Sequence, residues 1–230
     1  MSLNDDLIGG VAAIFRGSWS TRQGQKVPEP ENVTLGNDAV ELDATVLYAD
    51  LAASTELVDA YKLPFAAKIY KSYLHSAAKI TSSEGGTITA YDGDRIMATF
   101  LGNSKNTSAA RAALKINYAV QKIINPAIKV QYPNSTYTVK QTVGIDTSPL
   151  FVARTGIRGS NDLVWVGRAA NYAAKLCDLS PDYPTRITDS VYKNLHESLR
   201  FTDGRAMWEA QSWTAMSGQT IYRSTWWWPL

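Results

Sequence analysis

The chain has 230 residues, of which 45% are hydrophobic and 19% are charged, as in ordinary globular proteins. Its formal net charge of +2 is too small to indicate nucleic-acid binding through a basic face, so any polyanion it binds is expected to be small. No stretch approaches the ~18 uninterrupted apolar residues of a membrane span, and the acidic N-terminus does not resemble a signal peptide, so we expect a cytoplasmic protein without a membrane partner.

The first 40 residues hold glycines and prolines among polar neighbours, which predicts a loosely structured N-terminal arm (residues 1–40) before a folded domain (residues 41–230). An apolar, β-branched run over residues 42–49 predicts a buried strand that ends at Asp50. Ser54 or Thr55 can cap the helix that follows. Pro64 suits the first turn of a second helical piece, whose apolar positions share one face: Phe65, Ile69, Tyr73, Ala77 and Ile80.

The second half of the domain begins with two short β runs, residues 87–91 and 95–100, joined by an Asp-Gly turn that is typical of a hairpin. An amphipathic pattern over residues 109–124 predicts a helix that ends at Asn125-Pro126. Residues 136–145 and 150–154 predict strands, and a last helix follows Gly167. This order predicts an α+β domain in which helices cover one face of a mostly antiparallel sheet.

Asp50 and Asp94 are the candidate metal ligands. Asp50 lies where a strand meets a helix, a place that suits a triphosphate if a cation stands between the two negative charges. Asp94 follows the hairpin turn, and adjacent strands can bring it beside Asp50 to form a hard-oxygen site for Mn²⁺ or Mg²⁺. The alternative for Asp50 is a simple helix cap, and for Asp92, in the same hairpin, it is a turn residue that tolerates the turn's backbone angles.

Four segments of the chain, in this order, are similar to those of the class III nucleotide cyclases: VLYADLAAST, EGGTITAYDGDRIMATF, TVGIDTSPLFVARTG and WVGRAANYAAKL. The resemblance covers roughly residues 42–222. It implies a ferredoxin-like cyclase homology domain, with two metal ions per site held by Asp50, Asp94 and the Leu51 carbonyl. It also implies a homodimer with two shared active sites, in which the metals come from one subunit and the transition-state residues from the other.

The resemblance assigns the transition-state residues to Asn171 and Lys175, which lie four apart and share a helix face. The family usually has arginine at the second position; lysine keeps the charge but loses the bidentate fork. The family's phosphate-binding lysine has no clear counterpart near Thr214. Its substitute can be one of three arginines that are otherwise solvated: Arg154, Arg158 and Arg168.

The base pocket departs most from the purine cyclases, because the alignment places Ile88 and Val164 where those enzymes have polar side chains. Tyr48 shares a strand face with Asp50 and can narrow the pocket, and Arg95 can reach base carbonyls. The alternative interpretations are a core aromatic residue for Tyr48 and a surface charge for Arg95.

With these features the chain resembles the pyrimidine (PycC-like) cyclases of bacterial Pycsar anti-phage defence. This resemblance implies conversion of a pyrimidine nucleoside triphosphate to its 3′,5′-cyclic monophosphate and pyrophosphate. Arg95 favours UTP over CTP, because uracil presents two carbonyl acceptors and cytosine presents one. A separate effector protein would read that product in antiviral defence. The alternatives are an adenylate cyclase and a non-catalytic cyclase-homology module that binds nucleotide or a partner.

Several residues with reactive or aromatic side chains are interpreted as structural. Cys177 is the only cysteine, which excludes an internal disulfide, and we interpret it as a small buried hydrophobe. His75 and His196 have no neighbouring His or Cys in the sequence and are assigned structural roles. The C-terminal run from Trp226 to Pro229 either packs on the sheet edge or forms an exposed partner site.

Overall fold

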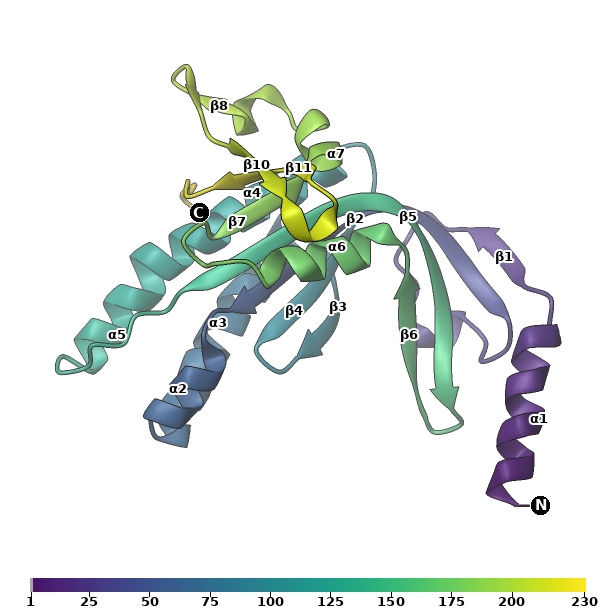
Figure 1. The fold of residues 1–230 in the computed structure, drawn as a ribbon. Helices are drawn as coiled ribbons and strands as arrows, with labels where there is room; N and C mark the ends of the chain where they lie inside the picture. Colours follow the sequence, from purple (N-terminus) through teal and green to yellow (C-terminus); the bar gives the residue numbers. More distant parts are fainter. Residues whose placement is uncertain (1) are drawn as a thin grey trace.

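The computed structural model describes residues 2–230, and its centre is a nine-stranded sheet (Figure 1). The strand order is β10-β11-β7-β5-β2-β4-β3, with β1 added beside β2 and β6 beside β5. Most neighbours are antiparallel; the β1–β2 and β5–β7 pairs are parallel. The strands are β1 (Ser20–Gln23), β2 (Asp38–Leu51), β3 (Thr87–Asp92), β4 (Arg95–Phe100), β5 (Gln141–Ile157), β6 (Ser160–Val166), β7 (Thr185–Thr188), β10 (Glu209–Trp213) and β11 (Gln219–Ser224), and a separate ribbon holds β8 (Phe201–Thr202) and β9 (Arg205–Ala206).

The helices connect these strands in a β-α-β-β-α-β order, and the central strands lie as β5-β2-β4-β3. The helices are α1 (Leu3–Arg16), α2 (Ser54–Ala60), α3 (Leu63–Ser83), α4 (Lys105–Ala119), α5 (Asn125–Gln131), α6 (Arg168–Cys177) and α7 (Asp189–Lys193). The predicted α+β class, with a mostly antiparallel sheet and a ferredoxin-like core, is confirmed.

Helices cover both faces of the sheet, whereas the sequence pattern predicted one covered face. Successive residues of β2 point to opposite faces: Leu47 packs with α3 and α4, and Val46 packs with the alanines of α6. Gly144 on β5 allows α6 to lie this close, because a Cβ there would stand 2.1 Å from the Ala173 carbonyl oxygen. Helix α6 therefore packs against β2 and β5 on the face of the sheet opposite α3 and α4.

Two prolines are accommodated differently from the prediction. One continuous strand, β5, holds residues 141–145 of the first predicted strand and all of the second, 150–154, whereas residues 136–140 precede it and are not in a strand. Pro149 of β5 pairs in register with Asp43 of β2. Pro149 fits because it lies between the stretches of β5 that pair with β7 and β6, where its missing N–H is not needed. The predicted helix does not end at Pro126. A π-helical turn (Val120–Ile124) follows α4, and Pro126 then lies in the first turn of α5.

The N-terminal arm is helical over residues 3–16 rather than loosely structured. Ser2 and Asp5 form a capping box, in which each side chain accepts a hydrogen bond from the other's backbone N–H. The helix projects from one end of the molecule (Figure 1). In residues 2–230 we find no helix with the length and hydropathy that crossing a membrane requires.

The C-terminal tryptophans pack mainly on helix α4. The Asn117 side chain donates to the carbonyls of Thr225 and Trp226, at 3.1 and 2.8 Å. Trp226 and Trp228 pack against the core, and Trp227 stays 39% exposed beside Tyr118. Packing was therefore the correct alternative, although the support is a helix and not the sheet edge.

Candidate active site

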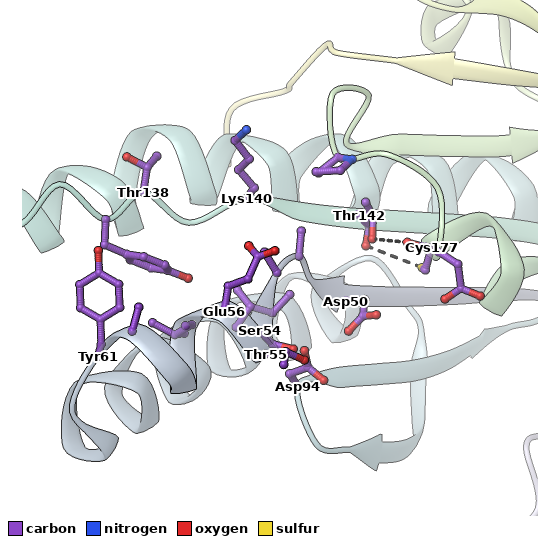
Figure 2. A pocket seen from close by; sticks show the side chains of 18 of the residues that line it. Asp50, Ser54, Thr55, Glu56, Tyr61, Asp94, Thr138, Lys140, Thr142 and Cys177 are labelled. Atoms are coloured by element: carbon purple, nitrogen blue, oxygen red, sulfur yellow. Dashed lines mark hydrogen bonds between the residues drawn. The ribbon is translucent and has the colours of Figure 1, made fainter.

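The structure brings Asp50 and Asp94 together at one end of a cavity of about 820 Å³. Asp50 is the penultimate residue of β2 and pairs with Arg95 across the β2–β4 ladder. The Leu51 N–H donates to the Asp94 carbonyl at 3.3 Å, which fixes the hairpin turn beside the end of β2. Figure 2 shows both carboxylates facing the same space. The two aspartates of one chain therefore lie close together, as the sequence predicted.

The electrostatics of Asp50 fit a cation site. One carboxylate oxygen, Oδ1, is buried and has no hydrogen-bond partner. Burial, and next the negative charge of Asp94, raise the Asp50 pKa to about 6. A divalent cation would satisfy the oxygen and offset the repulsion. Among residues 2–230 no third His, Cys, Asp or Glu joins them, so further ligands must be backbone carbonyls such as Leu51, water or substrate oxygens.

The same cavity holds a cation that the sequence analysis missed. Lys140 precedes β5, and the Ala52 N–H donates to its carbonyl oxygen at 3.0 Å. Lys140 is exposed and lines the same cavity as Ser54 and Thr55, and its amine end points away from Asp50 and Asp94 in Figure 2. Lys140 is the one lysine or arginine among the described residues that line this cavity. The antiparallel pairing of Leu51 with Gln141 places the start of β5 beside the end of β2, and the sequence alone does not specify this register.

Tyr48 and Arg95 lie together, as expected for two residues of one base pocket. The Arg95 guanidinium stands 5.9 Å from the Tyr48 ring centroid, and its Nε lies 3.8 Å from Asp92 Oδ2. Burial raises the Tyr48 pKa, so its hydroxyl stays protonated at neutral pH and can donate a hydrogen bond.

Ile88 is placed away from this group. A β-bulge between Ile88 and Ala90 breaks the alternation of β3, so Ile88 pairs with Ala98 and packs on the α3 side of the sheet. Ala90 instead pairs with Met97, which itself pairs with Tyr48. The row Tyr48, Met97 and Ala90 lies on the α6 side. Ala90, and not Ile88, thus occupies the strand position beside the predicted base pocket.

The other predicted residues lie outside the cavity. Asn171 and Lys175 are exposed on the outer face of α6, where Lys175 Nζ lies 3.8 Å from Met216 Sδ. Val164 is 38% exposed on β6, while its neighbours on that strand turn inward. Cys177, at the end of α6, does line the cavity and is buried as predicted. One chain therefore holds the aspartate end of the site, with the residues of α6 and β6 available to another chain.

The three arginines considered as substitutes for a phosphate-binding lysine also lie outside the lining of the cavity. Arg168 binds the buried carboxylate of Asp146 through Nε at 2.9 Å. Arg154 donates to the Asn161 side chain at 2.7 Å. These two guanidinium groups therefore make contacts within the fold, and Lys140 is the basic residue that lines the cavity.

Comparison with known proteins places the chain in a family. No protein-family model matches it. It is 52% identical over 229 residues to a uridylate cyclase of Xanthomonas perforans and 53% identical over 230 residues to one of Burkholderia cepacia, with 99% of each chain covered. A uridylate cyclase of Rhodovulum sp. is 42% identical over 99% of this chain and 98% of its own.

Solved structures agree on the fold. The adenylyl cyclase CyaB from P. aeruginosa superposes with a TM-score of 0.68 at 20% identity, over 81% of this chain and 95% of that one. The guanylyl cyclase Cya2 gives 0.67 at 15% identity, over 80% and 91%. The chain therefore belongs to the family of the uridylate cyclases and is a nucleotide cyclase with the class III cyclase fold.

Proposed function

We propose that the chain converts UTP to 3′,5′-cyclic UMP and pyrophosphate. The observation that carries this proposal is the cavity that Asp50 and Asp94 line together with Lys140, and the Tyr48–Arg95 pair on the same side of the sheet as Asp50. Three relatives that are uridylate cyclases, and that align over nearly the whole chain, support uridine as the base. Two Mn²⁺ or Mg²⁺ ions per site would neutralise the phosphates and lower the pKa of the ribose 3′-hydroxyl.

In this mechanism Asp50, Asp94 and the Leu51 carbonyl would hold the ions, and Lys140, which lines the same cavity, would bind the β- and γ-phosphates. The 3′-oxygen forms a bond to the α-phosphorus, the bond from that phosphorus to the bridging oxygen breaks, and pyrophosphate leaves. The proton of the hydroxyl passes to solvent. Asn171 orients the ribose, and Lys175 stabilises the charge that develops on the α-phosphate.

We propose that Asn171 and Lys175 act on the cavity of a second copy. Both side chains are exposed and neither lines the cavity of its own chain, so a monomer would hold metal and phosphate without its transition-state residues. A homodimer with two-fold symmetry supplies both missing residues to both cavities. Val164, exposed on the neighbouring strand, would enter the base pocket from the same side.

The base pocket is the basis for choosing a pyrimidine. Tyr48 fills space beside Asp50, and the row continues with Met97 and Ala90, whose side chains have no strong donor or acceptor for a purine edge. An unpaired buried polar group would cost about 1–3 kcal/mol, so purines bind poorly. Arg95 favours uracil, because uracil presents two carbonyl acceptors and cytosine presents one.

The direct test is a turnover assay with each of UTP, CTP, ATP and GTP, in Mn²⁺ and in Mg²⁺, with cyclic products identified by mass. We expect cyclic UMP as the main product. Faster conversion of ATP or GTP than of either pyrimidine would contradict the substrate assignment. Failure of every nucleotide to react would favour a non-catalytic nucleotide-binding role.

We extend the proposal to a role in anti-phage defence, inside the cell, in which a separate effector protein reads the cyclic nucleotide. Its support is the resemblance to the pyrimidine cyclases of such systems. Cells that carry the gene with its genomic neighbours should form fewer phage plaques than cells with the Asp50→Asn variant. Equal plaque numbers would contradict this role and leave the enzymatic assignment unaffected.

A further inference from the structure

Helix α1 carries an apolar stripe that its own domain does not cover. Exposed fractions range from 50% at Val11 to 85% at Phe15, and across residues 3–16 no side chain is buried. The exposed large apolar residues are Leu3, Leu7, Ile8, Val11, Ile14 and Phe15. Helical spacing gathers them on one side, while Asp5, Asp6 and Arg16 lie on the other. A contiguous exposed stripe of this size is typical of an interaction surface.

The base of α1 is fixed, so the stripe cannot fold back onto its own core without breaking contacts. The Asn37 side chain donates to the carbonyls of Ile14 and Gly17, at 2.9 and 2.6 Å. Trp19 packs edge-on against Phe151 with ring centroids 4.8 Å apart, and β1 then pairs with the start of β2. The helix leaves this anchor and points away from the sheet (Figure 1).

We propose that α1 packs against a second copy of this chain and stabilises the dimer that forms the composite active site; the inference rests on the proposed function for that composite site. The area supports a protein partner. The six side chains expose roughly 700 Å² in total, close to the ~800 Å² per partner of a standard interface. Burial of such a stripe is the main favourable term in association.

The position of α1 favours a second copy over another protein. Its anchor, β1, pairs with the start of β2, and the same stretch of β2 pairs with β5 where the β5–β6 hairpin begins, at Ala39 and Ala153. Helix α1 and the β5–β6 hairpin therefore extend from the same end of the sheet. The hairpin exposes Ile157, Val164 and Val166, by 71, 38 and 55%. Since Val164 is assigned to the partner's base pocket, one partner molecule can cover both apolar surfaces.

The charges of α1 do not favour a membrane surface. Amphipathic helices that bind anionic lipid carry several lysines or arginines on the polar side. The polar side of α1 has two acids near its start and one arginine near its end. An anionic bilayer would therefore repel the first turn of the helix, whereas a protein surface can pair with both signs of charge.

The test compares two full-length variants that place the same charge on opposite sides of α1. Val11→Asp lies in the centre of the stripe, and Ala13→Asp lies on the exposed polar side. Sedimentation equilibrium of the metal-loaded protein should show a dimer dissociation constant raised about 10- to 100-fold in Val11→Asp and unchanged in Ala13→Asp. Hydrogen exchange of residues 2–16 should slow as wild-type concentration rises.

Thermal melting of the two variants at low concentration should coincide, because α1 does not pack on its own domain. Equal dimerisation of Val11→Asp and wild type would overturn the inference, as would a wild-type chain that stays monomeric. Vesicle binding that Val11→Asp abolishes, without any effect on dimerisation, would also overturn it. Cyclic UMP production by wild type is measured separately: its absence beside an α1-dependent dimer would reject the proposed function alone.

Discussion

Asp50 has a proposed role in metal binding, and its negative charge destabilises the folded chain; the two effects can be measured separately. Its pKa of about 6 lies above the ordinary value of 3.8, so the folded state favours the protonated form. The resulting contribution to stability is fully present below pH 4 and is lost as the pH rises through about 6. At neutral pH, without metal, the ionised side chain therefore destabilises the fold.

Asp50→Asn should consequently melt higher than wild type at pH 7.5 in EDTA, while losing cyclase activity by at least about 100-fold. After allowance for solvent screening the gain is of order 1 kcal/mol, or about 2–4 °C. The two melting temperatures should converge near pH 4. The control Asp59→Asn removes an exposed charge outside the cavity and should change neither quantity. Retained activity would reject the metal site.

Tyr48→Ala should admit purines. Removal of the ring opens the space beside Asp50, so the ratio of ATP to UTP turnover, compared as kcat/KM, should rise about 10-fold. Tyr48→Phe keeps the ring and should still exclude purines. Tyr91→Ala is the matched control, because Tyr91 is 61% exposed and lines a groove with residues of α3. An unchanged ratio in Tyr48→Ala would mean that the ring does not exclude purines.

The residue-scale predictions succeeded where strand alternation holds and failed where it does not. Tyr48 and Asp50 share a face because β2 is regular there. The assignment of Ile88 was wrong in its orientation because the bulge at Thr89 reverses the alternation of β3, and nothing in the residue types signals that bulge. Lys140 was missed because its relation to Asp50 depends on the β2–β5 register, which the sequence does not specify.

At the scale of elements, Glu84 joins the end of α3 to α4. Its carboxylate accepts hydrogen bonds from Arg111 Nε at 2.6 Å and contacts Lys115 Nζ at 2.7 Å. Burial raises the Glu84 pKa, but the hydrogen bonds and charges of the two cations outweigh burial and hold it below its usual value. The resulting stability is present above the unfolded pKa of 4.5 and is lost as the pH falls through the lower folded value.

Glu84→Gln should lower the free energy of unfolding by about 1–2 kcal/mol at pH 7, because the two cations lose their counterion. The difference from wild type should shrink as the pH falls below 4.5 and through the lower pKa of the folded state, where wild-type Glu84 itself becomes protonated. Urea unfolding at a series of pH values measures both. Glu31→Gln, at an exposed position in the arm, serves as the control. A difference that does not depend on pH would contradict the ionic explanation.

The order of elements was predictable because each has its own local signal, whereas their continuity was not. Pro149 indicated a break in β5, yet the strand passes through it, because the neighbouring strands leave that stretch free on one side. Helix α1 was hidden by Gly9, Gly10 and the later prolines, although its capping box and apolar spacing are present in the sequence. Secondary-structure propensity is a property of single residues, whereas the continuity of β5 and the formation of α1 depend on the residues around them.

At the scale of the whole molecule, the shared site can be tested with two inactive variants. A mixed dimer of Asp50→Asn and Lys175→Ala contains one intact site, because the Lys175→Ala copy supplies both aspartates and the other copy supplies Lys175. Random exchange of subunits should restore about a quarter of wild-type activity. A mixture of Asp50→Asn and Asp94→Asn, which damages both metal sites, should restore none. Absence of complementation in subunits that do exchange would contradict the shared site.

Helix α6 has one more consequence in such a dimer. Its outer face would serve the partner's cavity through Asn171 and Lys175, while Cys177 at its end lines its own cavity and donates to the Tyr48 carbonyl at 3.2 Å. A short helix held this tightly moves as a unit, so nucleotide bound at one site shifts a wall of the other. We expect cooperative kinetics, with a Hill coefficient above 1 for UTP. The enzyme would then report changes in the nucleotide pool more steeply than two independent sites could, up to the Hill coefficient of about 2 that two coupled sites allow.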